Sequence, residues 1–140
     1  MCFGSAGGSP LPTELAAQFE RDLKVPVRNI YGMTESAGLI GIIPLAAERK
    51  PNSCGWRLPY TQVRAVPLGP GGEPMLHSPC KPEESGVIVI RGPHVSPGYT
   101  DESRNAGMFA ADGWLVSGDL GHIDAGEQIH VTGRAKDVII

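Results

Sequence analysis

Residues 30–35 (Ile-Tyr-Gly-Met-Thr-Glu) bring together residue types that can hold a nucleotide. The ring of Tyr31 offers a π face on which a base can stack, and Gly32 lets the backbone approach a ligand closely. The hydroxyl of Thr34 can donate to a phosphate oxygen, and the carboxylate of Glu35 can face Mg²⁺. Short segments of this kind arise often by chance, so their meaning depends on the rest of the chain.

Two further segments suit an adenosine. In residues 117–121 (Ser-Gly-Asp-Leu-Gly) a carboxylate, Asp119, follows a glycine at a strand end, where it can accept two hydrogen bonds from a ribose diol. The alternative is an aspartate that only shapes a turn. Residues 5–11 form a glycine-rich loop after a short apolar strand, and the alternative there is an ordinary strand-to-helix turn. Its spacing matches neither a Walker loop nor a dinucleotide-binding fingerprint.

Together, these segments resemble the motifs of the adenylate-forming superfamily, which includes acyl-CoA synthetases, luciferases and the adenylation domains of peptide synthetases. Four motifs occur in that family's order: residues 5–11, 31–35, 117–121 and 133–137. The resemblance runs through nearly all of the 140 residues. Residues 54–59 and 91–99 also resemble acyl-CoA synthetase segments and favour a carboxylic acid over an amino acid as the substrate.

The resemblance implies ten nucleotide-binding residues: Gly7, Gly8, Ser9, Pro10, Tyr31, Gly32, Met33, Thr34, Asp119 and Arg134. Tyr31 would stack on the adenine beside the glycine loop, and Asp119 with Arg134 would hold the ribose. Ser9 stands where the family more often has alanine, and Ser117 where it more often has threonine. Both are mild changes.

The resemblance also implies a reaction with two halves. A carboxylate attacks the α-phosphorus of ATP and expels pyrophosphate, and the acyl group of the resulting acyl-AMP then passes to the thiol of coenzyme A. Thr34 and Glu35 would be the catalytic residues, with Thr34 orienting the α-phosphate and Glu35 holding Mg²⁺. Lys136 would lie at the hinge of a small C-terminal domain. The implied enzyme is an AMP-forming acyl-CoA ligase of fatty acid metabolism, whose partners are a carboxylic acid, ATP and coenzyme A.

Two other functions stay open: an acyl-AMP ligase that loads a carrier protein, and a non-catalytic β-rich interaction module derived from such an enzyme. The family's phosphate loop and its C-terminal catalytic lysine have no counterpart in this sequence. The chain therefore resembles the later part of the large N-terminal domain, ending at the hinge. We expect millimolar or no ATP affinity and no turnover from this chain alone, and self-association through surfaces that the missing parts would cover.

Apolar periodicity predicts a helix ahead of the nucleotide segment. Thr13 is the expected N-cap, and the helix should end near Lys24 because a proline follows two residues later. Leu15, Phe19 and Leu23 recur at helical spacing and form one apolar face. We therefore expect a packing helix without chemistry of its own.

The remaining pattern predicts an α/β fold followed by β structure. Residues 25–31 read as a buried strand that carries the nucleotide segment at its carboxyl end, where ligands of α/β sheets usually bind, and residues 40–43 are a second apolar run. After the polar stretch 46–53 the spacing of apolar residues changes to a period of two, which is typical of strands, and Gly and Pro turns are frequent. The expected units are a partial α/β layer (residues 1–48), a small distorted β-barrel (residues 49–132) and a hinge (residues 133–140).

Several ring side chains are expected to be structural. Trp56, His94 and Tyr99 are long rings of the kind that fill the interior of a small barrel. Residues 122–132 should form a hairpin, on which His122 and His130 need no function.

Composition excludes several classes of function. Hydrophobic residues make up 41% of the chain, as in globular proteins, and a net charge of −3 argues against nucleic-acid binding. Three cysteines without a Cys-x-x-Cys pair predict neither a disulfide framework nor a zinc site. Without a long apolar run or a signal peptide, the expected location is cytoplasmic and no transmembrane segment is expected.

Overall fold

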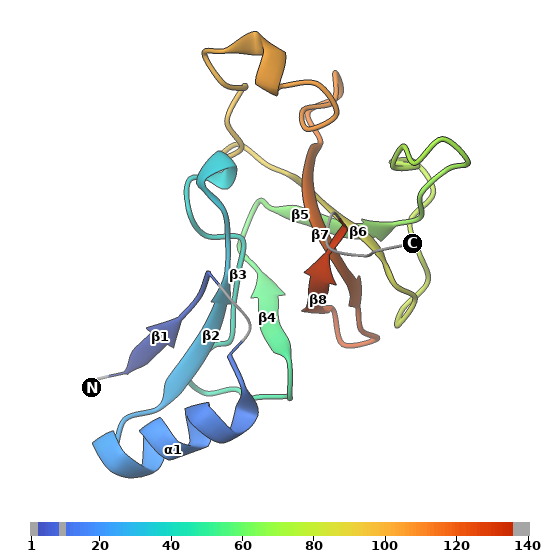
Figure 1. Cartoon of the computed structure of the whole chain (residues 1–140). Helices are drawn as coiled ribbons and strands as arrows, with labels where there is room; N and C mark the ends of the chain where they lie inside the picture. Colours follow the sequence, from blue (N-terminus) through green and yellow to red (C-terminus); the bar gives the residue numbers. More distant parts are fainter. Residues whose placement is uncertain (1–2, 9–10, 136–140) are drawn as a thin grey trace.

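The computed structural model describes residues 3–8 and 11–135, which form one α-helix and a mixed sheet of eight strands (Figure 1). The elements are β1 (Gly4–Ala6), α1 (Thr13–Leu23), β2 (Val27–Tyr31), the 3₁₀ turn η1 (Thr34–Ser36), β3 (Gly41–Ile42), β4 (Ser53–Arg57), β5 (Gln62–Val66), β6 (Gly86–Arg91), η2 (Glu102–Arg104), β7 (Leu115–Ile123) and β8 (Gln128–Arg134). Across the sheet the strand order is β1-β2-β3-β4-β8-β7-β6-β5. β1 and β2 are parallel, and the other neighbouring pairs are antiparallel.

The strand–helix–strand unit at the start of the chain forms as predicted, with α1 between the parallel strands β1 and β2. Its N-cap, however, is Pro12 rather than Thr13, so that prediction was wrong by one residue. Pro12 has a φ of −58°, the value to which its ring restricts it, and Thr13 is already helical. At the other end Lys24 adopts a φ of 55° and donates its N–H to the carbonyl of Glu20, so α1 ends where predicted.

The apolar face of α1 does not pack within the described part of the chain. Leu15, Phe19 and Leu23 are 43%, 46% and 59% exposed, whereas Ala16 is completely buried. The helix is also tied to β2 through Glu20, whose carboxylate accepts a hydrogen bond from the Val27 N–H at 2.8 Å. The apolar face predicted for α1 is present, but its large side chains stay exposed in the described residues.

The sheet is continuous across the polar stretch at residues 46–53. β3 and β4 flank that stretch along the chain and pair with each other, and β4 then pairs with β8. Hydrogen bonding thus runs from the α/β part into the remaining strands. The division of the chain at residue 48 stays a prediction.

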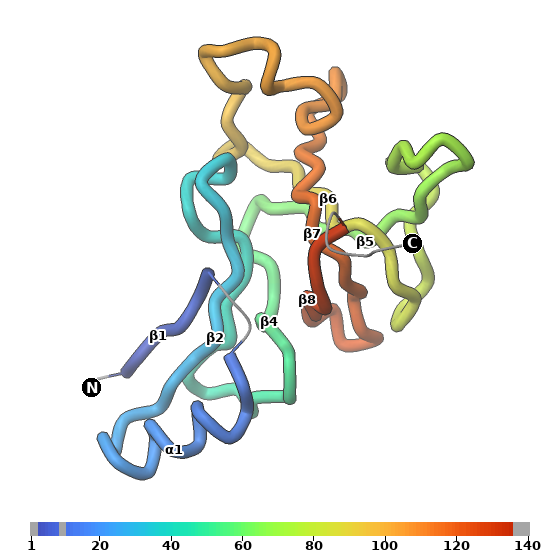
Figure 2. Tube along the Cα trace, viewed as in Figure 1, coloured from blue at the N-terminus to red at the C-terminus, as the bar shows by residue number. Residues whose placement is uncertain are grey.

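The strands after residue 53 curl without closing. Register shifts occur in the β4–β8, β6–β7 and β7–β8 pairs, and such irregularities bend a sheet. The tube in Figure 2 follows this curvature. Because β5 and β1 stay at opposite ends of the strand order, the expected β-barrel is an open, curled sheet in the described residues. The order of an α/β part followed by β structure is confirmed.

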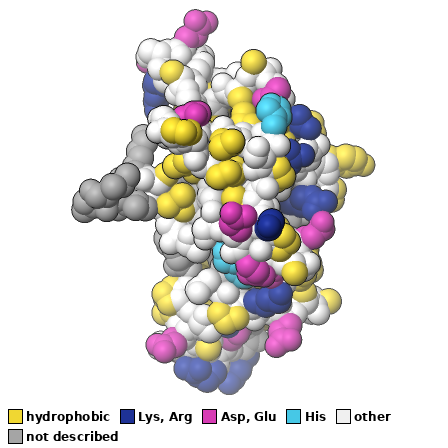
Figure 3. All heavy atoms as spheres, turned by 90° about the vertical axis from the view of Figure 1, so that its right-hand side faces the viewer, with side chains coloured by type: hydrophobic (Ala, Val, Ile, Leu, Met, Phe, Trp, Pro, Cys, Tyr) yellow, Lys and Arg dark blue, Asp and Glu magenta, His cyan; other side chains and the backbone are white. Residues whose placement is uncertain are grey.

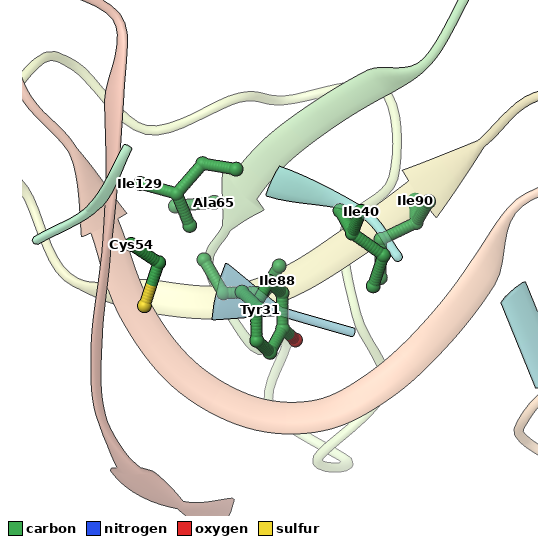
Figure 4. Close-up of a cluster of buried hydrophobic side chains, with 7 residues drawn as sticks. All are labelled: Tyr31, Ile40, Cys54, Ala65, Ile88, Ile90 and Ile129. Carbon is green, nitrogen blue, oxygen red and sulfur yellow. The ribbon is translucent and has the colours of Figure 1, made fainter. Parts of the chain in front are cut away.

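Both faces of β6 are covered by apolar side chains. Ile88 and Ile90 belong to a cluster that includes Tyr31, Ile40, Cys54, Ala65 and Ile129 (Figure 4). Val89 belongs to a second cluster, with Val66 and Trp114. Successive side chains of a strand point to opposite faces, which explains why β6 is apolar at every interior position.

The β7–β8 hairpin forms as predicted, with β7 ending at Ile123 and β8 beginning at Gln128. Gly126 lies in the turn of this hairpin, and its carbonyl accepts a hydrogen bond of 2.9 Å from the indole of Trp56, which is a structural contact.

Acidic and basic side chains are interspersed on the molecular face drawn in Figure 3. Among the helices of the described residues, none has the length and apolar character needed to cross a membrane.

Candidate nucleotide-binding site

Asp119 is the centre of a hydrogen-bonded group that joins three of the predicted site residues. Its side chain is 7% exposed. One carboxylate oxygen accepts a hydrogen bond from the Tyr31 hydroxyl at 2.6 Å, and the other lies 2.8 Å from Nε of Arg134. Burial, reinforced by the hydrogen bond to Asp119, raises the pKa of Tyr31, so this phenol stays a donor. The residues predicted for adenine and ribose are therefore in contact.

Strand pairing explains why residues so distant in the sequence meet. The β7–β8 register places Asp119 opposite Arg134. Ser117 fixes the backbone before the carboxylate, because its hydroxyl accepts from the Asp119 N–H at 3.0 Å and donates to a β6 carbonyl at 2.7 Å. Gly118, between them, has a φ of 75°, a conformation that favours glycine. β2 delivers Tyr31 at its carboxyl end.

A pocket of about 320 Å³ lies beside this group. This volume is within the range of sites for small molecules. Its walls are formed by Gly8, Leu11, Asn29, Ile30, Tyr31, Gly32, Asn52, Cys54, Asp119, Val131, Gly133 and Arg134. Burial raises the pKa of the Cys54 thiol to about 11, so Cys54 is a neutral part of the wall and not a nucleophile.

Asn29 lines this pocket, and its side chain contains an acceptor without a partner in the described residues. The side chain is 7% exposed, and its Nδ2 donates to the carbonyl of Ser53 at 3.2 Å. That carbonyl can only accept, which fixes the orientation of the amide, and Oδ1 is left buried without a partner in the described structure. A buried acceptor without a hydrogen bond is unfavourable. Asn29 lines the pocket, while Oδ1 itself is buried.

The sequence reasoning missed Asn29, although a signal was present. Asn29 precedes Tyr31 by two positions on β2, and side chains at that spacing share one face of a strand. A strand that delivers a stacking ring therefore also delivers the amide. Other pocket residues that were missed, such as Asn52 and Val131, come from distant segments and follow from no local pattern.

Two of the predicted glycines are needed for close packing of the loops. A Cβ at Gly32 would lie 1.5 Å from the carbonyl oxygen of Gly38, because the loop after η1 folds back against it. A Cβ at Gly7 would lie 2.6 Å from the side chain of Ile30. Gly8 lines the pocket, as predicted for the glycine loop, while Ser9 and Pro10 lie outside the described residues.

The residues predicted for phosphate and metal lie in η1, outside the pocket lining. Thr34 is exposed and Glu35 is half-buried, while Met33 packs against the first apolar cluster. The carboxylate of Glu35 accepts a hydrogen bond from the hydroxyl of Tyr99. The structure thus brings the adenosine residues together and leaves η1 as a separate, adjoining group. Lys136 lies outside the described residues.

Comparison with known proteins identifies the family. Residues 1–100 match the family described as AMP-binding enzyme. The chain belongs to this family. Marinolic acid–CoA ligase of Pseudoalteromonas sp. is 37% identical over 134 residues, which cover 96% of this chain and 20% of that protein. Feruloyl-CoA synthase of Amycolatopsis sp. is 36% identical over 135 residues, covering 96% of this chain and 26% of that protein. The chain thus spans about a fifth to a quarter of the length of these relatives.

Solved structures of AMP-binding enzymes share the fold. ATP-bound MatB from Rhodopseudomonas palustris superposes with a TM-score of 0.84 at 28% identity, covering 99% of this chain and 26% of MatB. O-succinylbenzoate coenzyme A synthetase (MenE) from Bacillus subtilis, in complex with ATP and magnesium ion, superposes with a TM-score of 0.77 at 33% identity, covering 97% of this chain and 27% of MenE. The chain has the fold of part of the N-terminal domain of adenylate-forming enzymes.

The residues that line the pocket of this chain fit an adenine nucleotide. The unpaired oxygen of Asn29 suits the exocyclic amine of adenine, and the buried carboxylate of Asp119 suits a ribose diol. Within the described residues no three His, Cys, Asp or Glu side chains gather to hold a metal ion. Proteins often bind Mg²⁺ through one or two carboxylates plus the phosphates of a substrate, and Glu35 is the carboxylate that the sequence predicts for it.

Proposed function

We propose that this chain supplies the adenosine-binding part of an ATP-dependent, AMP-forming acyl-CoA ligase. One observation carries the proposal: the buried carboxylate of Asp119, held between Tyr31 and Arg134, lines the same pocket as Asn29, whose Oδ1 has no partner in the described residues. These groups complement a ribose diol and an adenine amine at the same time. The relatives named above are themselves a CoA ligase and a CoA synthase, which supports this reaction class.

In this proposal each adenosine residue has one role. Asp119 accepts hydrogen bonds from the ribose hydroxyls, and Arg134 contacts the ribose and balances the charge of the carboxylate. Tyr31 stacks on the adenine, with its ring held in place by the hydroxyl bond to Asp119. Asn29 accepts a hydrogen bond from the adenine amine.

The residues of η1 serve the phosphates. Thr34, which is exposed, donates to the α-phosphate, and Glu35 is a ligand of Mg²⁺. The metal neutralises phosphate charge while the carboxylate of the acid displaces pyrophosphate from the α-phosphorus. The acyl group of acyl-AMP then passes to the thiol of coenzyme A. The task of this chain is to position the nucleotide and stabilise its charge.

Magnitudes indicate weak binding by this chain alone. One stack between a base and an aromatic ring contributes about 1–3 kcal/mol, and a hydrogen bond to a charged group about 1.5–3 kcal/mol. Association costs about 4–15 kcal/mol. We therefore propose millimolar or weaker ATP affinity for this chain, with tighter binding where the rest of the N-terminal domain completes the phosphate site.

Two alternatives concern the acyl acceptor and the presence of catalysis. A ligase that loads a carrier protein would use the same adenosine residues, but the CoA-linked names of the relatives favour coenzyme A. A non-catalytic interaction module would have no need for Asp119, Tyr31 and Arg134 to be in contact. Fatty acid metabolism stays a prediction of the family resemblance, and a cytoplasmic location stays a prediction of the sequence composition.

A comparison of AMP with IMP by NMR tests the adenosine site. IMP replaces the exocyclic amine with a carbonyl, which cannot donate to Oδ1 of Asn29. We expect AMP to shift the amide signals of Asn29, Tyr31 and Asp119 in a saturable way. IMP should bind roughly 5–10-fold more weakly, as expected for one lost hydrogen bond of about 1 kcal/mol. Equal affinities would remove Asn29 from the site, and no shift with either nucleotide would contradict the proposed function.

A further inference from the structure

The loop that precedes η2 is attached to η1 at a single residue, Glu35. The hydroxyl of Tyr99 donates to Oε1 of its carboxylate, and the backbone N–H of Ser96 donates to its carbonyl at 2.8 Å. Tyr99 and Glu35 are 64 residues apart in the sequence. One contact thus holds the backbone of Glu35 and the other holds its side chain.

Neighbouring residues restrain both the backbone and the ring of Tyr99, which is required of a residue that orients another side chain. Its backbone N–H donates to Oδ1 of Asn105 at 2.7 Å, and its carbonyl accepts from Nδ2 of the same amide at 3.3 Å. Its ring meets Phe109 edge to face, with centroids 6.0 Å apart and planes at 82°. The guanidinium of Arg104 lies 4.5 Å from the ring centroid. These contacts restrain both the backbone and the ring of Tyr99.

The carboxylate of Glu35 is only partly used by these contacts. Oε1 accepts from Tyr99, and in residues 3–8 and 11–135 no hydrogen bond or ion pair involves Oε2. Glu35 is half-buried, so this second oxygen is not closed off by packing. A carboxylate fixed through one oxygen, with the other free, is suited to bind a cation through a single oxygen.

We propose that Tyr99 is a positioning residue for Glu35: its hydroxyl holds one carboxylate oxygen so that the other is presented to the divalent cation of the nucleotide. The inference rests on the proposed function, in which Glu35 is the Mg²⁺ ligand. Mg²⁺ requires near-ideal octahedral geometry, so a pre-oriented ligand binds it better than a freely rotating one. In this proposal Tyr99 has a positioning role in addition to the structural role that the sequence suggested.

The test separates metal binding from adenosine binding. Mn²⁺ replaces Mg²⁺ as a paramagnetic probe, together with an ATP analogue that has a non-hydrolysable α,β linkage. The variants are Tyr99→Phe, Glu35→Gln and the double variant, and Tyr60→Phe is the matched control because Tyr60 is 88% exposed. NMR measures two quantities for each: the affinity for AMP without metal, and the nucleotide-dependent broadening of Glu35 signals by Mn²⁺.

We expect Tyr99→Phe to weaken Mn²⁺ binding by roughly 10-fold, the lower end of the effect of losing an outer-shell partner. AMP affinity should stay within about twofold of wild type, because Asp119 and Arg134 are untouched. The double variant should bind Mn²⁺ no more weakly than Glu35→Gln, since Tyr99 acts through that carboxylate. Tyr60→Phe should resemble wild type in both measurements.

Three outcomes overturn the inference. Unchanged Mn²⁺ binding in Tyr99→Phe removes the positioning role. Equal losses of AMP and Mn²⁺ binding in Tyr99→Phe would indicate a structural role alone. Wild-type protein that binds AMP while Mn²⁺ leaves the Glu35 signals unbroadened removes this role and leaves the adenosine site intact. Failure of the proposed function has a different signature, because wild-type protein would then show no saturable AMP binding.

Discussion

At the residue scale, the site depends on which polar groups have partners and which do not. Asp119 has a partner for each carboxylate oxygen, whereas Asn29 keeps an unpaired Oδ1 and Glu35 a free Oε2. Sequence motifs pointed to Asp119 and Glu35 by residue type. The spacing to Tyr31 could have pointed to Asn29 as a residue on the same strand face, but not to its unpaired Oδ1, which depends on Ser53 accepting from the amide nitrogen.

Asp124 gives a residue-scale prediction about stability and pH. Burial raises its pKa, but hydrogen bonds from Lys50, the Gln128 N–H and His130 outweigh that effect and hold the pKa well below the ordinary value. Because the folded-state pKa lies below the unfolded value of about 3.9, the stability from Asp124 is fully present above that pH. It is lost as the pH falls toward the folded-state pKa.

We therefore expect Asp124→Asn to lower the free energy of unfolding at pH 7 by about 1–3 kcal/mol. The difference in unfolding free energy between wild type and variant should decrease as the pH falls below about 4. Urea unfolding at several pH values measures both. Asp112→Asn is the control, because Asp112 is exposed and its nearest basic partner, His77, lies at 3.8 Å. A gap that stays constant or widens toward low pH would contradict this assignment.

At the element scale, the loop between η1 and β3 depends on one glycine. Gly32→Ala places a Cβ 1.5 Å from the backbone oxygen of Gly38, so the loop must move. We expect a loss of about 1–3 kcal/mol in unfolding free energy, comparable with other overpacked sites, and altered amide signals at Tyr31 and Thr34. Gly133→Ala is the control, since a Cβ there meets nothing within 4 Å. Equal stability of the two variants would count against the packing described.

α1 gives the second prediction at this scale. Its exposed apolar face, formed by Leu15, Phe19 and Leu23, should cause self-association of the isolated chain. Light scattering should show mass rising above the monomer value with concentration. A Leu15→Ser/Phe19→Ser variant should stay monomeric with little change in its unfolding midpoint, because both side chains are exposed. A wild-type chain that stays monomeric at high concentration would refute this prediction.

The elements also show where sequence reasoning succeeded and where it could not. The limits of the helix and of the β7–β8 hairpin followed from proline, glycine and apolar spacing, which act locally. Closure of the sheet did not follow, because it depends on whether β5 finds a second partner, and no pattern within β5 encodes that. The exposure of the apolar face of α1 could not be predicted either. Periodicity shows that one face of a helix is apolar, but it does not show which segment packs against that face.

At the scale of the whole molecule, the fold gathers the residues of the proposed adenosine site, while the residues proposed for the phosphates lie outside the pocket lining. The chain spans about a fifth to a quarter of its relatives' length. We therefore expect no ATP–pyrophosphate exchange above background from the purified 140-residue protein. Exchange should require the remaining parts of the N-terminal domain. A clear signal from this chain alone would show that its own residues complete the catalytic site.

The most direct test of the central claim, a preformed adenosine site, is an NMR titration with a non-hydrolysable acyl-adenylate analogue. We predict saturable shifts confined to the segments around Tyr31, Thr34 and Asp119, and their loss in Asp119→Asn. The analogue carries adenine, ribose and the α-phosphate position but needs no metal, so it probes the pocket and Thr34 without Mg²⁺. The absence of shifts in a chain with a well-dispersed, folded spectrum would contradict the claim and favour a non-catalytic module.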